Sequence, residues 1–260
     1  MKTDLTWKSK VNTVDSRRDI VILQDSDETV RFCVRHFISL ANEAIKDHGF
    51  FYVALSGGST PKVIFQQMSK PEFKHEVDWS KVMLFWSDER CVPPTSLDSN
   101  YRMAMDSGFS SLPVLPEHIF RIKGEIEPAK AAEDYNHLIE EAVPDHQFDL
   151  VMLGMGPDGH TASLFPGTSG LEVGNRLVIA NYIPQKETWR LTFTLSLINH
   201  AKNIAFYTMG EGKAEMLKRV LDKEESPPLP AQRVGTHQHK ALWIVDSAAA
   251  ALLEKIKKTE

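Results

Sequence analysis

The stretch FFYVALSGGSTP, residues 50–61, decides the fold class of this chain. Its first half, Phe50–Leu55, is a continuous run rich in aromatic and branched apolar side chains, which is typical of a strand covered on both faces. The run ends at a pair of glycines, and Pro61 suits the first turn of a following helix. A buried strand, a glycine turn and a helix in this order predict one unit of a parallel α/β sheet.

The same alternation extends to both sides of this stretch. Upstream, apolar residues at helical spacing predict a helix over 26–48, capped by Ser26 or Asp27 and closed by Gly49. Downstream, apolar runs and amphipathic stripes alternate as far as a terminal helix capped by Asp246. The predicted strands are 82–86, 119–122, 148–153, 177–180, 191–195, 204–209 and 242–245, and the predicted helices between them are 99–107, 128–143 and 212–221. We expect an α/β fold, a single three-layer Rossmann-like domain over residues 1–260 with a parallel-rich sheet and helices on both faces.

Length, composition and charge exclude several classes of protein. The 260 residues are 42% hydrophobic and 25% charged, which excludes whole-chain disorder, collagen and coiled coil. A net charge of −5 offers no general attraction for nucleic acid or an anionic membrane, and no stretch approaches the ~20 apolar residues of a membrane span. Cys33 and Cys91 lie far apart without a CxxC spacing, so neither a disulfide framework nor a zinc knuckle is indicated. We expect an unexported, cytoplasmic protein with no nucleic-acid or membrane partner.

Ligands of parallel α/β sheets bind beyond the carboxyl ends of the strands, so the residues after each predicted strand are the first candidates. Gly57, Gly58, Ser59 and Thr60 follow the first buried strand. Glycines let the backbone approach a ligand, and a helix N-terminus offers free N–H groups to an anion. The segment predicts a phosphate cradle; the alternative is a tight turn that needs glycine only for its dihedral angles.

A second charged cluster follows the strand 82–86. Asp88, Glu89 and Arg90 combine two acids and a guanidinium, which can orient a polyhydroxylated ligand or a carboxylate by forked hydrogen bonds. The alternative is a solvated strand end with a local ion pair.

The segment LGMGPDGHT, residues 153–161, follows the strand 148–153. Its three glycines satisfy GxGxxG, but no long helix is predicted to open there, and a P-loop would need lysine where His160 stands. Neither nucleotide-binding interpretation holds. Asp158, two residues earlier, can fix the tautomer of the imidazole while His160 handles a proton. A histidine without function is the alternative, which the strand end and the glycines disfavour.

Two further cations stand at strand ends. Arg190 opens the strand 191–195 and Lys213 follows the strand 204–209, so either can close over a phosphate dianion opposite the glycine loop. Singly, each is more often a surface charge. The sequence has no G-x-S-x-G elbow and no H-E-x-x-H motif, and the pair His237 and His239 lacks a nearby acid or cysteine. The sequence therefore gives no motif for an acyl-serine mechanism or for a zinc site.

Taken together and in this order, these segments resemble the 6-phosphogluconolactonase family of the oxidative pentose phosphate pathway, within the glucosamine-6-phosphate deaminase-like superfamily. The resemblance rests on LSGGSTP, SDERCVP, LGMGPDGHTASLFPG, WRLTFTL and GEGKAEMLKRVL, and it covers nearly the whole chain. It implies a glucosamine-6-phosphate deaminase-like fold that hydrolyses 6-phospho-D-glucono-1,5-lactone to 6-phospho-D-gluconate without metal or cofactor. The partner would be this small sugar phosphate lactone, and we expect a monomer.

The resemblance also assigns roles by position. It places the general base at His160, with Asp158 beside it, and the phosphate loop at Gly57, Gly58, Ser59 and Thr60. It places contacts to the sugar phosphate at Arg190 and Lys213. Near the reacting end of the ligand it places a cation, Arg90, and an orienting acid, Asp88. The chemistry fits these residues, because a δ-lactone is an activated ester that water can open with one base of pKa near ~6.5. Binding energy from the remote phosphate can then hold C1 against the base.

Two alternatives remain. The first is an amino-sugar phosphate isomerase-deaminase. That family has a segment like Asp-Glu-Tyr where this chain has Asp88-Glu89-Arg90. It also normally carries an acid shortly after the histidine, whereas residues 161–166 of this chain contain none. A non-catalytic sugar-phosphate sensor would keep the cradle and lose the proton-transfer pair, whereas Asp158 and His160 are both present.

Overall fold

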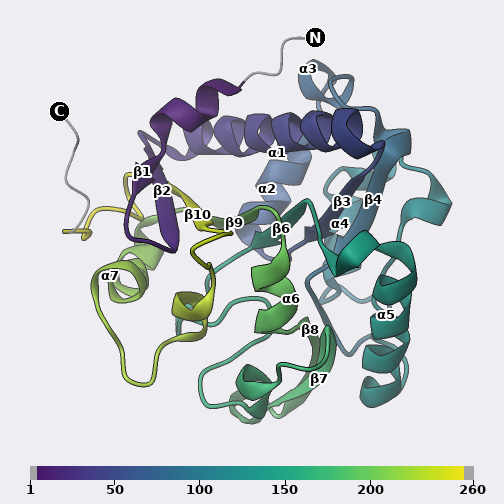
Figure 1. Cartoon of the computed structure of the whole chain (residues 1–260). Coiled ribbons are helices and arrows are strands. Elements are labelled where there is room, and N and C mark those ends of the chain that lie inside the picture. Colours follow the sequence, from purple (N-terminus) through teal and green to yellow (C-terminus); the bar gives the residue numbers. More distant parts are fainter. Residues whose placement is uncertain (1–4, 255–260) are drawn as a thin grey trace.

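The computed structural model describes residues 5–254 and shows two sheets around one hydrophobic core (Figure 1). None of the described helices is both long and apolar enough to cross a membrane. The strands are β1 (Asn12–Thr13), β2 (Arg18–Leu23), β3 (Phe51–Leu55), β4 (Val82–Trp86), β5 (Asp88–Arg90), β6 (Leu150–Leu153), β7 (Val178–Ile183), β8 (Thr188–Phe193), β9 (Ile204–Thr208) and β10 (Ala241–Asp246). The α-helices are α1 (Ser26–His48), α2 (Ser59–Met68), α3 (Pro71–Lys74), α4 (Asn100–Asp106), α5 (Pro128–Ala142), α6 (Leu195–His200) and α7 (Ala214–Asp222).

The large sheet has the order β1-β2-β10-β9-β6-β3-β4 and is parallel except for the β1–β2 pair, which confirms the predicted α/β class. The chain crosses the sheet in one direction from β2 through β3 to β4 and returns through β6, β9 and β10. Because such crossovers are right-handed, the two directions place their helices on opposite faces. Accordingly α1 and α2 lie on one side of the sheet and α5, α6 and α7 on the other (Figure 1).

The reversal creates a crevice at the carboxyl ends of β3 and β6. These two strands are neighbours, with Val53 paired to Leu150, yet their outgoing connections leave toward opposite faces. A crevice at such a switch point is the usual ligand site of an open α/β sheet. The glycine loop after β3 and the segment after β6 therefore meet there.

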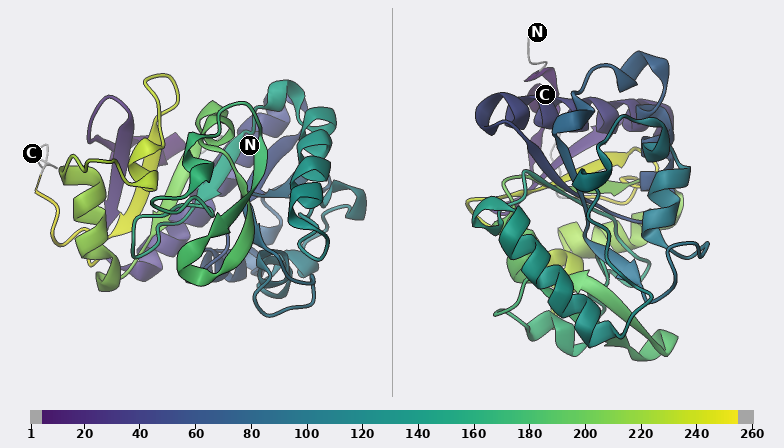
Figure 2. Two further views of the ribbon diagram at one scale, coloured as in Figure 1. Left: turned by 90° about the horizontal axis from the view of Figure 1, so that it is seen from below. Right: turned by 90° about the vertical axis from the view of Figure 1, so that its right-hand side faces the viewer.

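The small sheet, β5-β8-β7, is antiparallel and was not expected from sequence. The chain leaves the large sheet at Ser87, whose N–H still donates to the Leu55 carbonyl oxygen at 2.8 Å. It then pairs with a strand about a hundred residues away, with Arg90 opposite Arg190. The hairpin of β7 and β8 lies in front of the large sheet in the view from below (Figure 2). This arrangement brings residues of β5 and β8 to the same side as the crevice.

Helix α1 has the predicted bounds but a different cap. Asp25 is the N-cap and accepts the Glu28 N–H, while Gly49 closes the helix at φ 92° with its N–H on the Ile45 carbonyl oxygen. The prediction of Ser26 or Asp27 as the cap is therefore wrong by one or two residues.

Two predicted elements are wrong. The segment 119–122, which follows the 3₁₀ turn Pro116–His118, makes a single bridge from Ile119 to Leu84, with the Phe120 N–H donating to the Leu84 carbonyl oxygen at 2.8 Å. One bridge is too little pairing to make a strand. The terminal helix after Asp246 is a set of turns over 247–252, and the rest of that prediction lies outside the described residues. The strand β2 was not predicted at all.

Candidate active site

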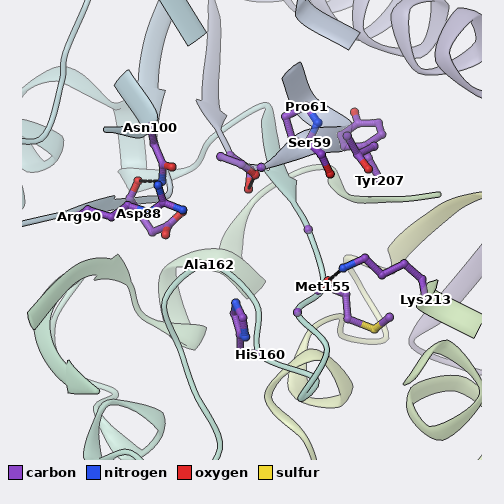
Figure 3. Close-up of a pocket in the computed structure, with 16 residues that line it drawn as sticks. Ser59, Pro61, Asp88, Arg90, Asn100, Met155, His160, Ala162, Tyr207 and Lys213 are labelled. Atoms are coloured by element: carbon purple, nitrogen blue, oxygen red, sulfur yellow. Dashed lines mark hydrogen bonds between the residues drawn. The ribbon is translucent and has the colours of Figure 1, made fainter. Parts of the chain in front are cut away.

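A pocket opens at the carboxyl ends of β3, β6 and β9, as the topology requires. Figure 3 shows Asp88, Arg90 and Asn100 on one side of it and Lys213 on the other, with His160 between them. Its lining includes every residue proposed from sequence except Glu89, Asp158 and Arg190. The lining residues are Ser56, Gly57, Gly58, Ser59, Thr60, Pro61, Asp88, Arg90, Asn100, Gly154, Met155, Gly156, His160, Ala162, Tyr207 and Lys213.

The glycine loop presents an open helix N-terminus to this pocket. Gly58 is the N-cap of α2 with φ 110°, a left-handed value that favours glycine, and no described side chain caps the helix there. The first N–H groups of α2 are therefore available to an anion at the positive end of the helix dipole. Ser59, which is exposed, and Thr60, which is half-buried, add hydroxyl groups beside them.

Gly57 is required for a different reason. A Cβ on Gly57 would lie 1.9 Å from Oδ1 of Asn100, which is 1% exposed. The Asn100 side chain also donates from Nδ2 to the Asp88 carbonyl oxygen at 2.9 Å. The buried amide of Asn100 thus packs against the glycine loop and holds β5 next to that loop through the Asp88 carbonyl oxygen.

His160 is held on three sides. Its Nδ1 lies 2.5 Å from Oδ1 of Asp158, and its ring stacks on Phe165 with centroids 3.9 Å apart. On the remaining side, a Cβ on Gly156 would lie 2.0 Å from the imidazole. The orientation of the ring is fixed by packing as well as by a hydrogen bond.

The pKa of Asp158 decides which nitrogen of the imidazole is basic. Partial burial raises the pKa of Asp158, but hydrogen bonding to His160 and the charge of that ring outweigh burial, so the pKa lies below its ordinary value. The carboxylate is then ionised at neutral pH and accepts, so Nδ1 of His160 carries the proton. Nε2 keeps a free lone pair, which suits it to take a proton from water.

Asp88 and Glu89 have different surroundings although they are adjacent. Asp88 lines the pocket and accepts a hydrogen bond from the Ser163 hydroxyl at 2.8 Å. Glu89 points to the start of α4, where it accepts from Ser99 Oγ and from the N–H groups of Asn100 and Tyr101. Burial raises the pKa of Glu89, and these hydrogen bonds oppose the shift. Glu89 therefore stabilises a helix end and is not a pocket residue.

Lys213 reaches the pocket from the turn after β9. Its Nζ donates to the Met155 carbonyl oxygen at 2.7 Å, which leaves two ammonium hydrogens for a ligand. Partial burial lowers the pKa of Lys213, and the charge of Asp158 opposes that shift.

Arg190 lies beside Arg90 rather than in the pocket lining. The two residues are cross-strand neighbours, and the Nε of each is buried without a partner among residues 5–254. Burial and the nearby Arg90 charge lower the pKa of Arg190, whereas Asp88 opposes the shift. A second positive charge thus lies beside that of Arg90.

Sequence reasoning missed several lining residues. Asn100 was missed because its contact with Gly57 joins residues far apart in the chain. Ala162 follows His160 with φ 47°, an unusual value for a residue with a side chain, and no sequence signal marks it. Tyr207 lies in the fully buried strand β9, where the apolar sequence indicates a residue of the hydrophobic core. In the described part of the chain, no group of three His, Cys, Asp or Glu side chains is placed to hold a metal ion.

Known proteins match this chain over most of its length. A family model described as glucosamine-6-phosphate isomerases/6-phosphogluconolactonase matches residues 24–243. A 6-phosphogluconolactonase of Chlamydia pneumoniae is 44% identical over 213 residues, which cover 81% of this chain and 81% of that protein. A 6-phosphogluconolactonase of Chlamydia muridarum is 40% identical over 228 residues, which cover 88% of this chain and 88% of that protein. The crystal structure of a 6-phosphogluconolactonase from Thermotoga maritima is 31% identical with a TM-score of 0.75 and covers 87% of this chain and 98% of that one. The chain therefore belongs to the family of glucosamine-6-phosphate isomerases and 6-phosphogluconolactonases.

Proposed function

We propose that this chain hydrolyses 6-phospho-D-glucono-1,5-lactone to 6-phospho-D-gluconate, the second step of the oxidative pentose phosphate pathway. The observation that carries the proposal is that one pocket holds both His160, paired with Asp158, and the open N-terminus of α2. The pair can move a proton and the helix end can bind a phosphate. The relatives named 6-phosphogluconolactonase support this choice of substrate.

His160 acts as the general base. Its Nε2 takes a proton from a water molecule, and the water oxygen bonds to the lactone carbonyl carbon C1. The carbonyl oxygen carries the charge until the bond from C1 to the ring oxygen breaks, and the imidazolium then returns the proton to that ring oxygen. The products are a carboxylic acid and a hydroxyl group, so no covalent enzyme intermediate is needed. Asp158 holds the imidazole in the required tautomer throughout.

The remaining pocket residues bind and orient the substrate. Gly57, Gly58, Ser59 and Thr60 receive the phosphate at the N-terminus of α2. Lys213 supplies an ammonium group to the same phosphate. Arg90 stands near the reacting end, with the charge of Arg190 beside it. Asp88 orients sugar hydroxyls. Phosphate binding far from C1 thereby holds the reacting carbon against the base.

We propose that this chain acts as a cytoplasmic monomer, without a cofactor, a metal, a nucleic-acid partner or a membrane.

The test is an assay of acid release from freshly generated 6-phosphogluconolactone, measured above spontaneous hydrolysis. His160→Ala should lower kcat by about 10²–10⁴-fold, because general base assistance contributes about that much, and should keep most of the affinity for 6-phosphogluconate. His137→Ala is the control, since the side chain of His137 is 63% exposed on α5. Binding of 6-phosphogluconate without turnover would indicate a sensor, and ammonia release from glucosamine 6-phosphate would indicate a deaminase.

A further inference from the structure

A buried carboxylate behind the pocket joins three segments of the chain. Asp246 ends β10 and is 1% exposed. Its two oxygens both accept the Gly210 N–H at 3.0 Å, Oδ2 also accepts the Ser26 hydroxyl at 2.9 Å, and Oδ1 accepts the Ala249 N–H at 2.8 Å. The carboxylate therefore connects the start of α1, the turn after β9 and the turn after β10.

The turn after β9 is the one that carries Lys213. Gly210 has φ 92° and precedes the short 3₁₀ helix Glu211–Lys213, and the Lys213 N–H donates back to the Gly210 carbonyl oxygen at 3.0 Å. From this turn the Lys213 side chain extends to the Met155 carbonyl oxygen in the pocket. Gly210 thus accepts a hydrogen bond from the backbone of Lys213 and donates one to the Asp246 carboxylate.

A lysine needs such support more than most side chains do. Its four-carbon stem has many rotamers, so the position of its ammonium group depends on a fixed backbone and on a contact such as the one with Met155. A hydrogen bond from a backbone N–H to an ionised carboxylate is among the stronger anchors available. Asp246 also lies beside Ser26, the first residue of α1, where the positive end of the helix dipole favours a negative charge.

We propose that Asp246 is a positioning residue for phosphate binding: it holds the Gly210 turn so that Lys213 presents its ammonium group to the phosphate of the substrate. Asp246 does not touch the pocket itself. The inference rests on the proposed function, because it takes from it the role of Lys213.

The test is the near-isosteric substitution Asp246→Asn, which keeps the shape but leaves one oxygen and one amide group where two oxygens accept hydrogen bonds. We expect KM for the phosphorylated lactone to rise about tenfold, the loss that a weakened hydrogen bond to a charged group gives, with kcat within twofold. KM for unphosphorylated glucono-1,5-lactone should stay unchanged. A rise in KM for both lactones alike, or no rise at all, overturns the proposal.

A matched control separates positioning from general stabilisation. Asp149 is also a buried carboxylate, but it accepts from the Tyr52 N–H, His48 and Lys202 at the other end of the sheet. Asp149→Asn should lower the melting temperature without the selective rise in KM. If Asp246→Asn does not fold, Ser26→Ala removes one donor to the same carboxylate and should give a smaller selective rise, and its absence would overturn the proposal.

The double variant Asp246→Asn/Lys213→Ala shows whether the carboxylate acts through Lys213. In the Lys213→Ala background, Asp246→Asn should cause no further rise in KM for the phosphorylated lactone, since the group it positions is gone. Additive effects overturn the proposal. If Lys213→Ala alone leaves KM unchanged, the inference fails together with the phosphate role of Lys213, whereas continued lactone hydrolysis leaves the assignment of His160 intact.

Discussion

A Cβ atom on Gly156 would lie 2.0 Å from both Cε1 and Nδ1 of His160, so the place of the imidazole depends on the absence of a side chain at residue 156. Contacts that short do not occur in folded proteins, and the ring has Phe165 on another side. The glycine-rich segment after β6 thus serves the histidine as well as the backbone turn.

Gly156→Ala should therefore lower kcat for lactone hydrolysis by about 10²–10⁴-fold, because the ring must leave the position in which Asp158 fixes its tautomer. Gly174→Ala is the matched control, since an added Cβ there meets nothing within 4 Å. Both variants should be compared by kcat and by melting temperature. Normal turnover in Gly156→Ala would show that the ring position is not needed.

Gly57→Ala should disturb the phosphate cradle rather than the base. The added Cβ would lie 1.9 Å from Oδ1 of Asn100, and overpacking of this kind costs about 1–3 kcal/mol. The expected result is weaker binding of 6-phosphogluconate, measured by titration calorimetry, together with a lower free energy of unfolding.

The contact predicts a specific rescue. Asn100→Ala removes the clashing atoms, so Gly57→Ala should cost less in the Asn100→Ala background than in the wild-type chain. The rescue is incomplete, because Asn100→Ala also loses the hydrogen bond to the Asp88 carbonyl oxygen. Additive losses in the double variant would show that the two residues do not act through this contact.

The parts of the fold that the sequence predicted are those with a strong local signal. Phe51–Leu55, the glycine turn and α2 follow from consecutive residues, as do the bounds of α1. The small sheet could not be predicted in this way, since the pairing of Arg90 with Arg190 joins positions a hundred residues apart. The place of strand β2 is set by its pairing with β10 at the other end of the chain, which no local pattern shows.

The same distinction applies to the site. Strand ends and glycines indicated the loops that line the pocket, because topology brings carboxyl ends together. The sequence could not separate Asp88 from Glu89, since the partners of Glu89 are the hydroxyl and backbone N–H groups at the start of α4. Nor could it show that Asp246 binds the turn of Lys213, because that contact depends on the neighbouring positions of β9 and β10.

Stability should depend on pH through His36, a histidine of α1 with no part in the proposed mechanism. It is 1% exposed, with its ring edge against Trp7 and Nδ1 3.4 Å from the Tyr207 hydroxyl. Burial lowers the pKa of His36 to about 3, from an ordinary value of 6.5. Between these two values the unfolded chain binds a proton that the folded chain does not, so folding weakens as the pH falls from 6.5 toward 3, by about 1.4 kcal/mol per pH unit.

His36→Phe keeps a ring in place and removes the titration. Urea unfolding at pH 7 and pH 4.5 should show that the wild-type chain loses about 2.5 kcal/mol more than this variant over that range, because other titrating groups contribute equally to both. The loss of the Tyr207 contact lowers the stability of the variant at both pH values and does not affect this difference. His137→Asn, at an exposed position of α5, should behave as the wild-type chain does. Equal losses in His36→Phe and wild type would mean that the imidazole can take up a proton inside the folded protein.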